Sequence, residues 1–206
     1  MRKITLFITV LTVLVCLNGC SDTGNKTDAT IPESGVLTIT FDYEKQSGHA
    51  SNQFAVWIED MDGNYVKTLY ATRYTANGGY KNRPDSIFLW VEKSELASME
   101  KSDVDALTSA TPKEGALSYV WDLTDKNGDE VTPGEYRFFV EGSLRWKNRV
   151  LYTGVVDISG TAVTVQGEAE YIYESSNGQP VLTAEASENN MVNGVTASWE
   201  PKVHAD

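Results

Sequence analysis

After the first 34 residues, apolar and polar positions alternate along most of the chain. Within residues 36–43, one face carries only large apolar side chains, from Leu37, Ile39, Phe41 and Tyr43. Because successive side chains of a strand point to opposite sides, this pattern is typical of a half-buried strand. Comparable patterns predict further strands over residues 54–59, 65–74, 117–121, 135–141, 149–158, 162–166, 168–173 and 195–199.

Turn-forming dipeptides recur between these segments. They are Asp62-Gly63, Asn127-Gly128, Pro133-Gly134, Ser159-Gly160, Asn177-Gly178 and Asn193-Gly194. Short strands separated by such turns favour an all-β fold. We therefore expect residues 35–206 to form an antiparallel, immunoglobulin-like β-sandwich, with the apolar faces packed together and Thr, Glu and Lys in water.

Residues 75–115 lack regular alternation, so we expect one long irregular insertion in the sandwich. Within its 84–99 segment, Ile87, Trp90 and Val91 have helical spacing, which favours a helix. A strand over residues 87–91 is the alternative. Loops carried by rigid sheets often hold functional residues, so we expect functional residues within the insertion.

The N-terminus has the features of a bacterial lipoprotein signal peptide. Arg2 and Lys3 precede an apolar run over residues 4–16, which is shorter than the roughly 20 residues that span a bilayer. The run ends at Leu17-Asn18-Gly19-Cys20, a lipobox pattern. We therefore expect residues 1–19 to be removed and Cys20 to carry lipid. The alternative is an ordinary secreted protein with an unrelated cysteine.

Residues 20–34 are small and polar, which predicts a flexible tether between the anchor and the sandwich. Acyl chains on Cys20 would hold the protein on a membrane without crossing it. The expected location is therefore extracytoplasmic and lipid-anchored, at the outer membrane or the periplasmic side.

Charge and cysteine content exclude several classes of function. The chain has a formal net charge of −12, which becomes −14 once Arg2 and Lys3 leave with the signal peptide. Such an acidic protein will not bind nucleic acid through bulk electrostatics. With Cys20 lipidated, no thiol remains for a disulfide or a metal. His49 and His204 are the only histidines, so zinc sites and Ser-His-Asp hydrolysis are disfavoured.

The segment over residues 121–136 resembles a hairpin of flagellar hook-capping immunoglobulin-like domains, with the pattern WDG-x-D-x-x-G-x-x-V-x-x-G-x-Y. Trp121 and Tyr136 match its aromatic ends, whereas Leu123 stands where that pattern has Gly. The resemblance implies a fold and no chemistry. The acidic turn also suggests a calcium site, although EF-hand spacing fails; a solvated turn is the alternative for Asp122, Asp125 and Asp129.

Inside the insertion, the segment from Asp105 to Thr111 resembles the flavinylation motif D-x-x-S/T-G-A-S/T of extracytoplasmic proteins that carry covalent FMN. In those families a flavin transferase splits FAD and joins FMN through its phosphate to the last hydroxyl. By position that acceptor is Thr111, with Asp105, Thr108 and Ala110 matching the motif, whereas Ser109 stands where Gly is usual. The alternative is a Ser/Thr-rich loop without modification.

A bound FMN would need partners for its ring and its phosphate. Trp90 and Tyr80, from the same insertion, could stack on the flavin ring. Arg73, Lys81 and Arg83 could offset the phosphate charge. The alternatives are core packing for Trp90 and ordinary surface charge for the three basic residues.

The chain is also similar, from about residue 35 to 201, to a family of predicted periplasmic proteins, domain of unknown function 2271. The similarity rests on Ala55-Val56-Trp57-Ile58-Glu59-Asp60, Asp62-Gly63, Val66-Lys67-Thr68-Leu69, Ala110-Thr111-Pro112, Val120-Trp121-Asp122 and Gly134-Glu135-Tyr136. Members tend to be encoded near PepSY-type membrane reductases and flavin transferases. The resemblance implies a non-enzymatic covalent-FMN electron carrier that works with a membrane reductase. The alternative is a non-catalytic immunoglobulin-like structural or binding lipoprotein.

Overall fold

The fold is taken from a computed structural model, which describes residues 34–46, 52–109, 112–143, 149–174, 180–183 and 191–202. The expected signal peptide, the Cys20 that is expected to carry lipid, and all but the last residue of the expected tether lie outside these residues. So do Ala110 and Thr111 of the flavinylation-like motif, and the expected Asn177-Gly178 turn.

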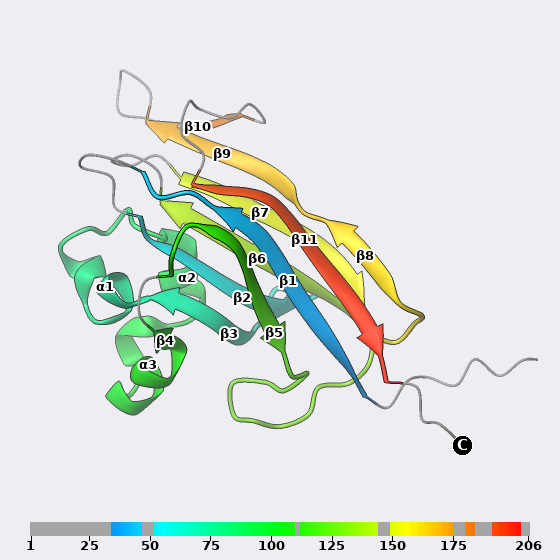
Figure 1. Cartoon of the computed structure of the whole chain (residues 1–206). Helices are drawn as coiled ribbons and strands as arrows, with labels where there is room; N and C mark the ends of the chain where they lie inside the picture. Colours follow the sequence, from blue (N-terminus) through cyan, green and yellow to red (C-terminus); the bar gives the residue numbers. More distant parts are fainter. Residues whose placement is uncertain are drawn as a thin grey trace, which may run out of the picture. The chain divides into compact units, whose positions relative to one another are not determined.

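Two β-sheets form the sandwich (Figure 1). The four-stranded sheet has the order β5 (Gly115–Trp121), β1 (Gly35–Tyr43), β11 (Val192–Pro201) and β8 (Val163–Gln166). The seven-stranded sheet has the order β10 (Pro180–Thr183), β9 (Glu168–Glu174), β7 (Arg149–Asp157), β6 (Glu135–Ser143), β2 (Phe54–Asp60), β3 (Tyr65–Thr72) and β4 (Thr108–Ser109). All described pairings are antiparallel except that of β3 with β4. The predicted all-β sandwich is confirmed.

The main core lies between the two sheets and follows the alternation in the sequence. On β1 the odd-numbered residues from Leu37 to Tyr43 are buried, and on β6 Phe138 and Val140 face the same core. Burying each such side chain contributes roughly 1.5–3 kcal/mol of hydrophobic free energy. This burial explains why period-two patterning located the strands correctly.

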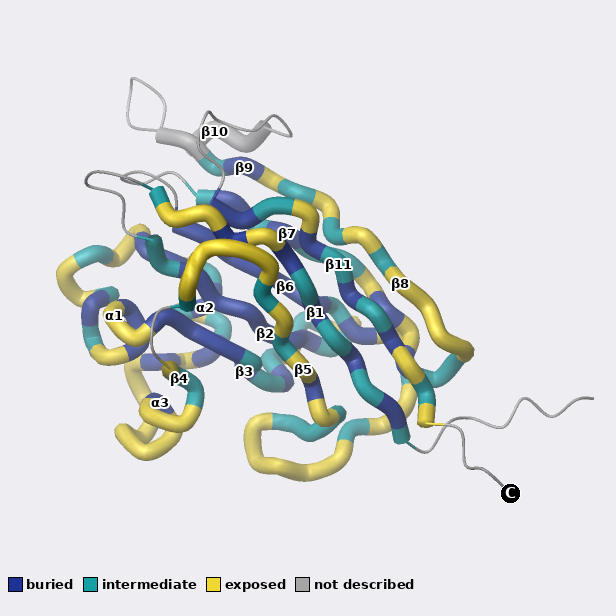
Figure 2. The backbone as a smooth tube through the Cα atoms, in the orientation of Figure 1, coloured by how far each residue is buried: buried dark blue, intermediate teal, exposed yellow. Residues whose placement is uncertain are grey.

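A second core covers the opposite face of the seven-stranded sheet. The segment between β3 and β5 contains the short helices α1 (Arg73–Ala76), η1 (Gly79–Lys81), α2 (Phe88–Lys93), η2 (Leu96–Ser98) and α3 (Lys101–Leu107). They pack on β2, β3 and β6, where the rings of Trp57 and Phe139 stack with centroids 4.9 Å apart. Sheet faces on both sides of β2 are therefore covered, and this strand is buried almost throughout (Figure 2).

The structure settles the open question over residues 84–99 in favour of helix. It also differs from the sequence prediction in three places. β3 ends at Thr72, because Arg73 already begins α1. The two-residue β4 and the four-residue β10 were not predicted, since such short strands carry too little alternation. Asn193-Gly194 lies inside β11, where Gly194 has φ +63 and the register with β1 shifts, so it is a bulge and not a turn.

Candidate functional site

The flavinylation-like motif begins on α3 and continues along the edge of the seven-stranded sheet. Asp105 is exposed on α3, Thr108 is half-buried in β4, and Ser109 is exposed. The two residues of β4 pair in parallel with Ala71 and Thr72 of β3. The described part of the motif thus lies on an accessible surface at a strand edge (Figure 2).

Ser109, which replaces the usual Gly of the motif, has an extended backbone in β4. It is not among the non-glycine residues with positive φ. A side chain at this position therefore costs no left-handed strain in the observed conformation. Ser109 also lies beside Tyr70: burial raises the pKa of Tyr70 to about 12, and the Ser109 hydroxyl acts in the opposite direction.

Glu141 of β6 holds the helical layer on the sheet. This carboxyl is 1% exposed and accepts the backbone N–H groups of Leu89 and Trp90, at 3.2 Å and 2.9 Å. The Arg149 guanidinium lies 3.9 Å away. Burial raises the pKa of Glu141, while Trp90, Arg149 and Leu89 act in the opposite direction. The backbone N–H groups in the first turn of α2 thus donate to a side chain of a strand that is distant in sequence.

Two further contacts fix the same layer. The Ser143 hydroxyl accepts the N–H of Ile87 at 3.0 Å. Ile87 has φ +42, an uncommon conformation for a β-branched residue, and this bond helps hold it. On β2, the buried Glu59 accepts the Lys93 ammonium at 3.0 Å and the indole N–H of Trp57 at 2.8 Å. The insertion is therefore anchored at both ends of α2.

The structure corrects the expected role of Trp90. Its side chain is 0% exposed in the second core, and its indole N–H donates to Thr68 at 2.8 Å. It is a core residue and offers no face to a flavin ring. Tyr80 is half-buried and has the Lys81 ammonium 5.8 Å from its ring centroid.

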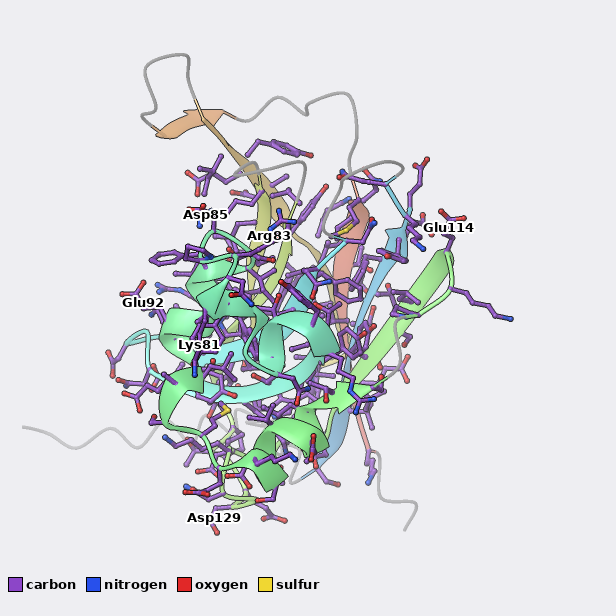
Figure 3. The ribbon with its side chains drawn as sticks, turned by 90° about the vertical axis from the view of Figure 1, so that its left-hand side faces the viewer. Lys81, Arg83, Asp85, Glu92, Glu114 and Asp129 are labelled. Atoms are coloured by element: carbon purple, nitrogen blue, oxygen red, sulfur yellow. The ribbon has the colours of Figure 1, made fainter. Side chains whose placement is uncertain are left out.

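The basic residues expected near the phosphate differ in position. Arg73 is exposed and directly follows Thr72, the residue that pairs with Ser109, so the register brings it level with the motif. Lys81 and Arg83 lie within the helical layer that faces the viewer in Figure 3. Arg73 is therefore the basic residue that the described geometry best relates to the motif.

A pocket of about 300 Å³ opens beside α3. Three separate parts of the chain line it: β3, the segment from α2 to α3, and the turn of the hairpin between β5 and β6. The lining residues are Tyr65, Lys67, Thr68, Ser94, Glu95, Ser98, Met99, Asp103, Leu107, Lys126 and Asn127. Its volume is at the lower end of the range for small-molecule sites.

Hydrogen bonds fix the floor of this pocket. The Thr68 hydroxyl lies 2.6 Å from the Tyr65 hydroxyl and accepts the indole N–H of Trp90. Burial raises the pKa of Tyr65, and its hydrogen bond to Thr68 acts in the opposite direction. The Lys67 ammonium donates to Asp122 at 3.0 Å and to the hydroxyl of Thr124. These contacts hold Tyr65 and Lys67 in place.

One polar group beside the pocket has no protein partner. The Ser94 hydroxyl is buried and makes no hydrogen bond among the described residues. An unmade hydrogen bond at a buried hydroxyl costs roughly 1–3 kcal/mol, so such a group calls for an explanation. A ligand atom in the pocket would supply one.

Two side-chain hydrogen bonds fix the hairpin whose turn lines the pocket. The Trp121 indole donates to the Thr124 carbonyl at 2.8 Å, and the Tyr136 hydroxyl donates to the Thr132 carbonyl at 2.7 Å. Leu123, which stands where the pattern has Gly, has φ +59. Leu123 thus has a left-handed backbone conformation, which glycine adopts with less strain. The relation to hook-capping domains remains a prediction.

The acidic turn in this hairpin is organised by its own backbone. Asp125 accepts the N–H groups of Asn127 and Asp129, at 2.8 Å and 3.0 Å, and these bonds lower its pKa. Asp122 is paired with Lys67. Across the described residues, no group of three or more His, Cys, Asp or Glu side chains is arranged to hold a metal ion. The Asp125 carboxylate is thus bonded within its own turn.

Sequence reasoning missed the pocket because its walls are far apart in the chain. Lys67, Ser94 and Asn127 carry no shared motif. One indication was available: the apolar run Phe54-Ala55-Val56-Trp57-Ile58 predicts a strand covered on both faces, and hence a layer over the outer face.

Comparison with known families identifies the chain. Residues 36–173 match the family described as "Predicted periplasmic protein (DUF2271)".

The chain belongs to this family.

The DUF2271 match covers every strand from β1 to most of β9, together with the helical layer and the pocket. The periplasmic description agrees with the extracytoplasmic location expected from the N-terminus. No curated protein and no solved structure matches the chain. Within the described residues, no helix has the length and apolar character that a membrane span requires.

Proposed function

We propose that this DUF2271 protein is a lipid-anchored electron carrier with FMN joined covalently to Thr111, and not an enzyme in its own right. The observation that carries the proposal is the flavinylation-like motif, whose described part lies on an exposed α3–β4 segment at a sheet edge. A flavin transferase must reach its target residue, and an edge segment is more accessible than a central strand.

The flavin transferase would catalyse the attachment, and this protein would supply only the acceptor hydroxyl and nearby charged groups. The transferase would cleave the pyrophosphate of FAD, form a phosphoester to the Thr111 hydroxyl and release AMP. Asp105, exposed four residues before Ser109, is available to the Mg²⁺ that accompanies phosphoryl transfer. Arg73, level with the motif in the β3–β4 register, could offset the phosphate charge. The cofactor would supply the redox chemistry, and the protein would hold it near its membrane reductase.

The test is modification of the full chain in cells that also express a flavin transferase. We expect in-gel flavin fluorescence and an added FMN mass in the wild type. Thr111→Ala should abolish both. Thr161→Ala is the matched control, because Thr161 is an exposed threonine outside the motif. A wild-type chain that stays unmodified, or a Thr111→Ala chain that is still modified, would overturn the proposal.

Membrane anchoring is tested separately with the same chain. We expect Cys20→Ser to release the protein from the membrane fraction, because no acyl chain can then be attached. Retention in washed membranes of a Cys20→Ser protein from which residues 1–19 have been removed would exclude the lipid anchor while leaving the flavin proposal untouched.

A further inference from the structure

We propose that the pocket beside α3 binds the isoalloxazine ring of the flavin, while the phosphate stays outside it. This inference rests on the proposed function, since it concerns the FMN on Thr111. It gives the pocket beside α3 a function, which the flavinylation-like motif alone does not. It also replaces Trp90, which is buried in the core, as the residue that receives the ring.

The lining of the pocket suits a ring with one apolar edge and one polar edge. Met99 and Leu107 offer apolar contact from the insertion side. From the hairpin turn, Lys126 offers hydrogen-bond donors, and Asn127 offers the amide proton that is not bonded to Asp125. An isoalloxazine has a dimethylbenzene edge and a pyrimidine edge with two carbonyl acceptors, so it matches both walls.

The aromatic residue of the pocket is Tyr65. Its hydroxyl is held 2.6 Å from that of Thr68, which fixes the ring in one orientation. A preorganised aromatic side chain can stack on a flavin with little loss of conformational entropy. The unpartnered Ser94 hydroxyl would gain an acceptor when a ring carbonyl or nitrogen enters.

The charges of the pocket favour the ring over the phosphate. Lys67 and Lys126 are balanced by Glu95 and Asp103, so the four charged side chains sum to zero. Lys67 is further neutralised by Asp122. The singly charged phosphodiester would gain little here, whereas a neutral dipolar ring meets no repulsion. The Lys126 ammonium makes no ion pair among the described residues and could stabilise the anionic reduced ring.

The proposed attachment point is close to the pocket in the sequence. Leu107, in the pocket wall, precedes Thr111 by four residues, which span at most about 14 Å when fully extended. The ribityl chain of FMN is a flexible connection between the phosphate and the ring. The ring therefore reaches the wall formed by Leu107 when Thr111 lies within the length of that connection.

The first test uses riboflavin as a probe and needs no covalent attachment. Full-chain Thr111→Ala protein is titrated with riboflavin, and quenching of riboflavin fluorescence is followed. We expect saturable binding that Leu107→Glu weakens by about tenfold or more, because it places a charge against the apolar edge. Ala106→Glu is the control: it adds the same charge to the exposed neighbouring position of α3, outside the pocket lining. Absence of saturable binding, or equal loss in both variants, would overturn the pocket assignment.

The second test uses the flavinylated chain and separates the two proposals. We expect Met99→Glu, a pocket substitution outside the motif, to carry the same FMN mass as the wild type but to show brighter flavin fluorescence, because the ring is released from Tyr65. Ala97→Glu, which adds the same charge at an exposed position outside the pocket lining, should remain quenched. Wild-type fluorescence as bright as free FMN would exclude the pocket but leave covalent attachment standing. If the chain carries no FMN at all, the proposed function fails. Ring binding in the pocket is then tested by the riboflavin titration alone.

Discussion

The carboxylate of Glu141 on β6 accepts the backbone N–H of Trp90 on α2 at 2.9 Å, although the two residues are 51 positions apart in the chain. A short helix has unsatisfied N–H groups in its first turn. Here they are satisfied by a buried acid of the sheet below and not by a residue of the helix itself. The contact ties the layer that carries the candidate site to the seven-stranded sheet.

Removing this acid should destabilise the protein strongly. Glu141→Ala would leave the N–H groups of Leu89 and Trp90 without an acceptor and Arg149 without its carboxylate. We expect a loss of about 3 kcal/mol in the free energy of unfolding. Urea unfolding followed by tryptophan fluorescence measures it. Glu170→Ala, at an exposed glutamate of β9, should change stability by less than about 0.5 kcal/mol. Equal effects of the two substitutions would refute the anchoring role.

The same residue predicts a pH dependence. Burial raises the pKa of Glu141 above its ordinary value of 4.5, with the Trp90 and Leu89 amides and Arg149 acting in the opposite direction. Between the two pKa values the folded state binds more protons than the unfolded state, so stability falls as pH rises. Its contribution is thus fully present below pH 4.5 and is lost as pH rises through the raised pKa.

Glu141→Gln isolates this effect, because glutamine keeps the shape of the side chain and does not ionise. We expect the stability difference, wild type minus Glu141→Gln, to decrease as pH rises from 4 to 8 in urea unfolding experiments. A difference that grows with pH would mean that the folded state favours the ionised form.

Strands that bury a single face, such as β1, could be predicted from the alternation in their sequence. Leu37 and Ile39 point into the main core, and the threonines between them do not. β4 could not be predicted, because two residues have no period and Thr108 and Ser109 become a strand only by pairing with β3. The start of α2 could not be predicted either: the pattern favours a helix within residues 84–99, but α2 begins only at Phe88. Its first-turn N–H groups are satisfied by Glu141, far away in sequence.

The candidate site also has one part that could be predicted from the sequence and one part that could not. The motif residues Asp105, Thr108 and Ser109 were predictable, because the pattern is local. The pocket was not, because Tyr65 and Leu107 become neighbours only through folding. Trp90 was assigned to the flavin because its helical spacing gave no indication of which face is covered. Trp57 of β2 and Phe139 of β6 point to the face of the seven-stranded sheet that the helices cover. Their stacked rings form part of the second core.

Close packing across β6 and β7 gives a third prediction. A Cβ atom added at Gly154 would lie 2.5 Å from the Phe138 ring, which is fully buried. Gly154→Ala should therefore cost about 1–3 kcal/mol through overpacking. Gly160→Ala is the matched control, because its nearest neighbour would be the Asp157 carboxylate at 3.6 Å, an ordinary contact. Thermal unfolding of both variants tests this, and an unchanged melting temperature for Gly154→Ala would show that Phe138 can move aside.

Thr68 links the second core to the pocket, and its hydroxyl should matter for both. Thr68→Val keeps the shape but removes the acceptor of the buried Trp90 indole N–H, at 2.8 Å, and the partner of the Tyr65 hydroxyl, at 2.6 Å. We expect a loss of about 1–3 kcal/mol in unfolding free energy. Thr68→Ser restores the hydroxyl and should recover most of it. The ring of Tyr65 would also be freed in Thr68→Val, so riboflavin binding should weaken more than in Thr68→Ser. If valine and serine variants are equally stable in urea unfolding, the indole N–H has found another acceptor, and the hydrogen bond to Thr68 does not determine the position of α2.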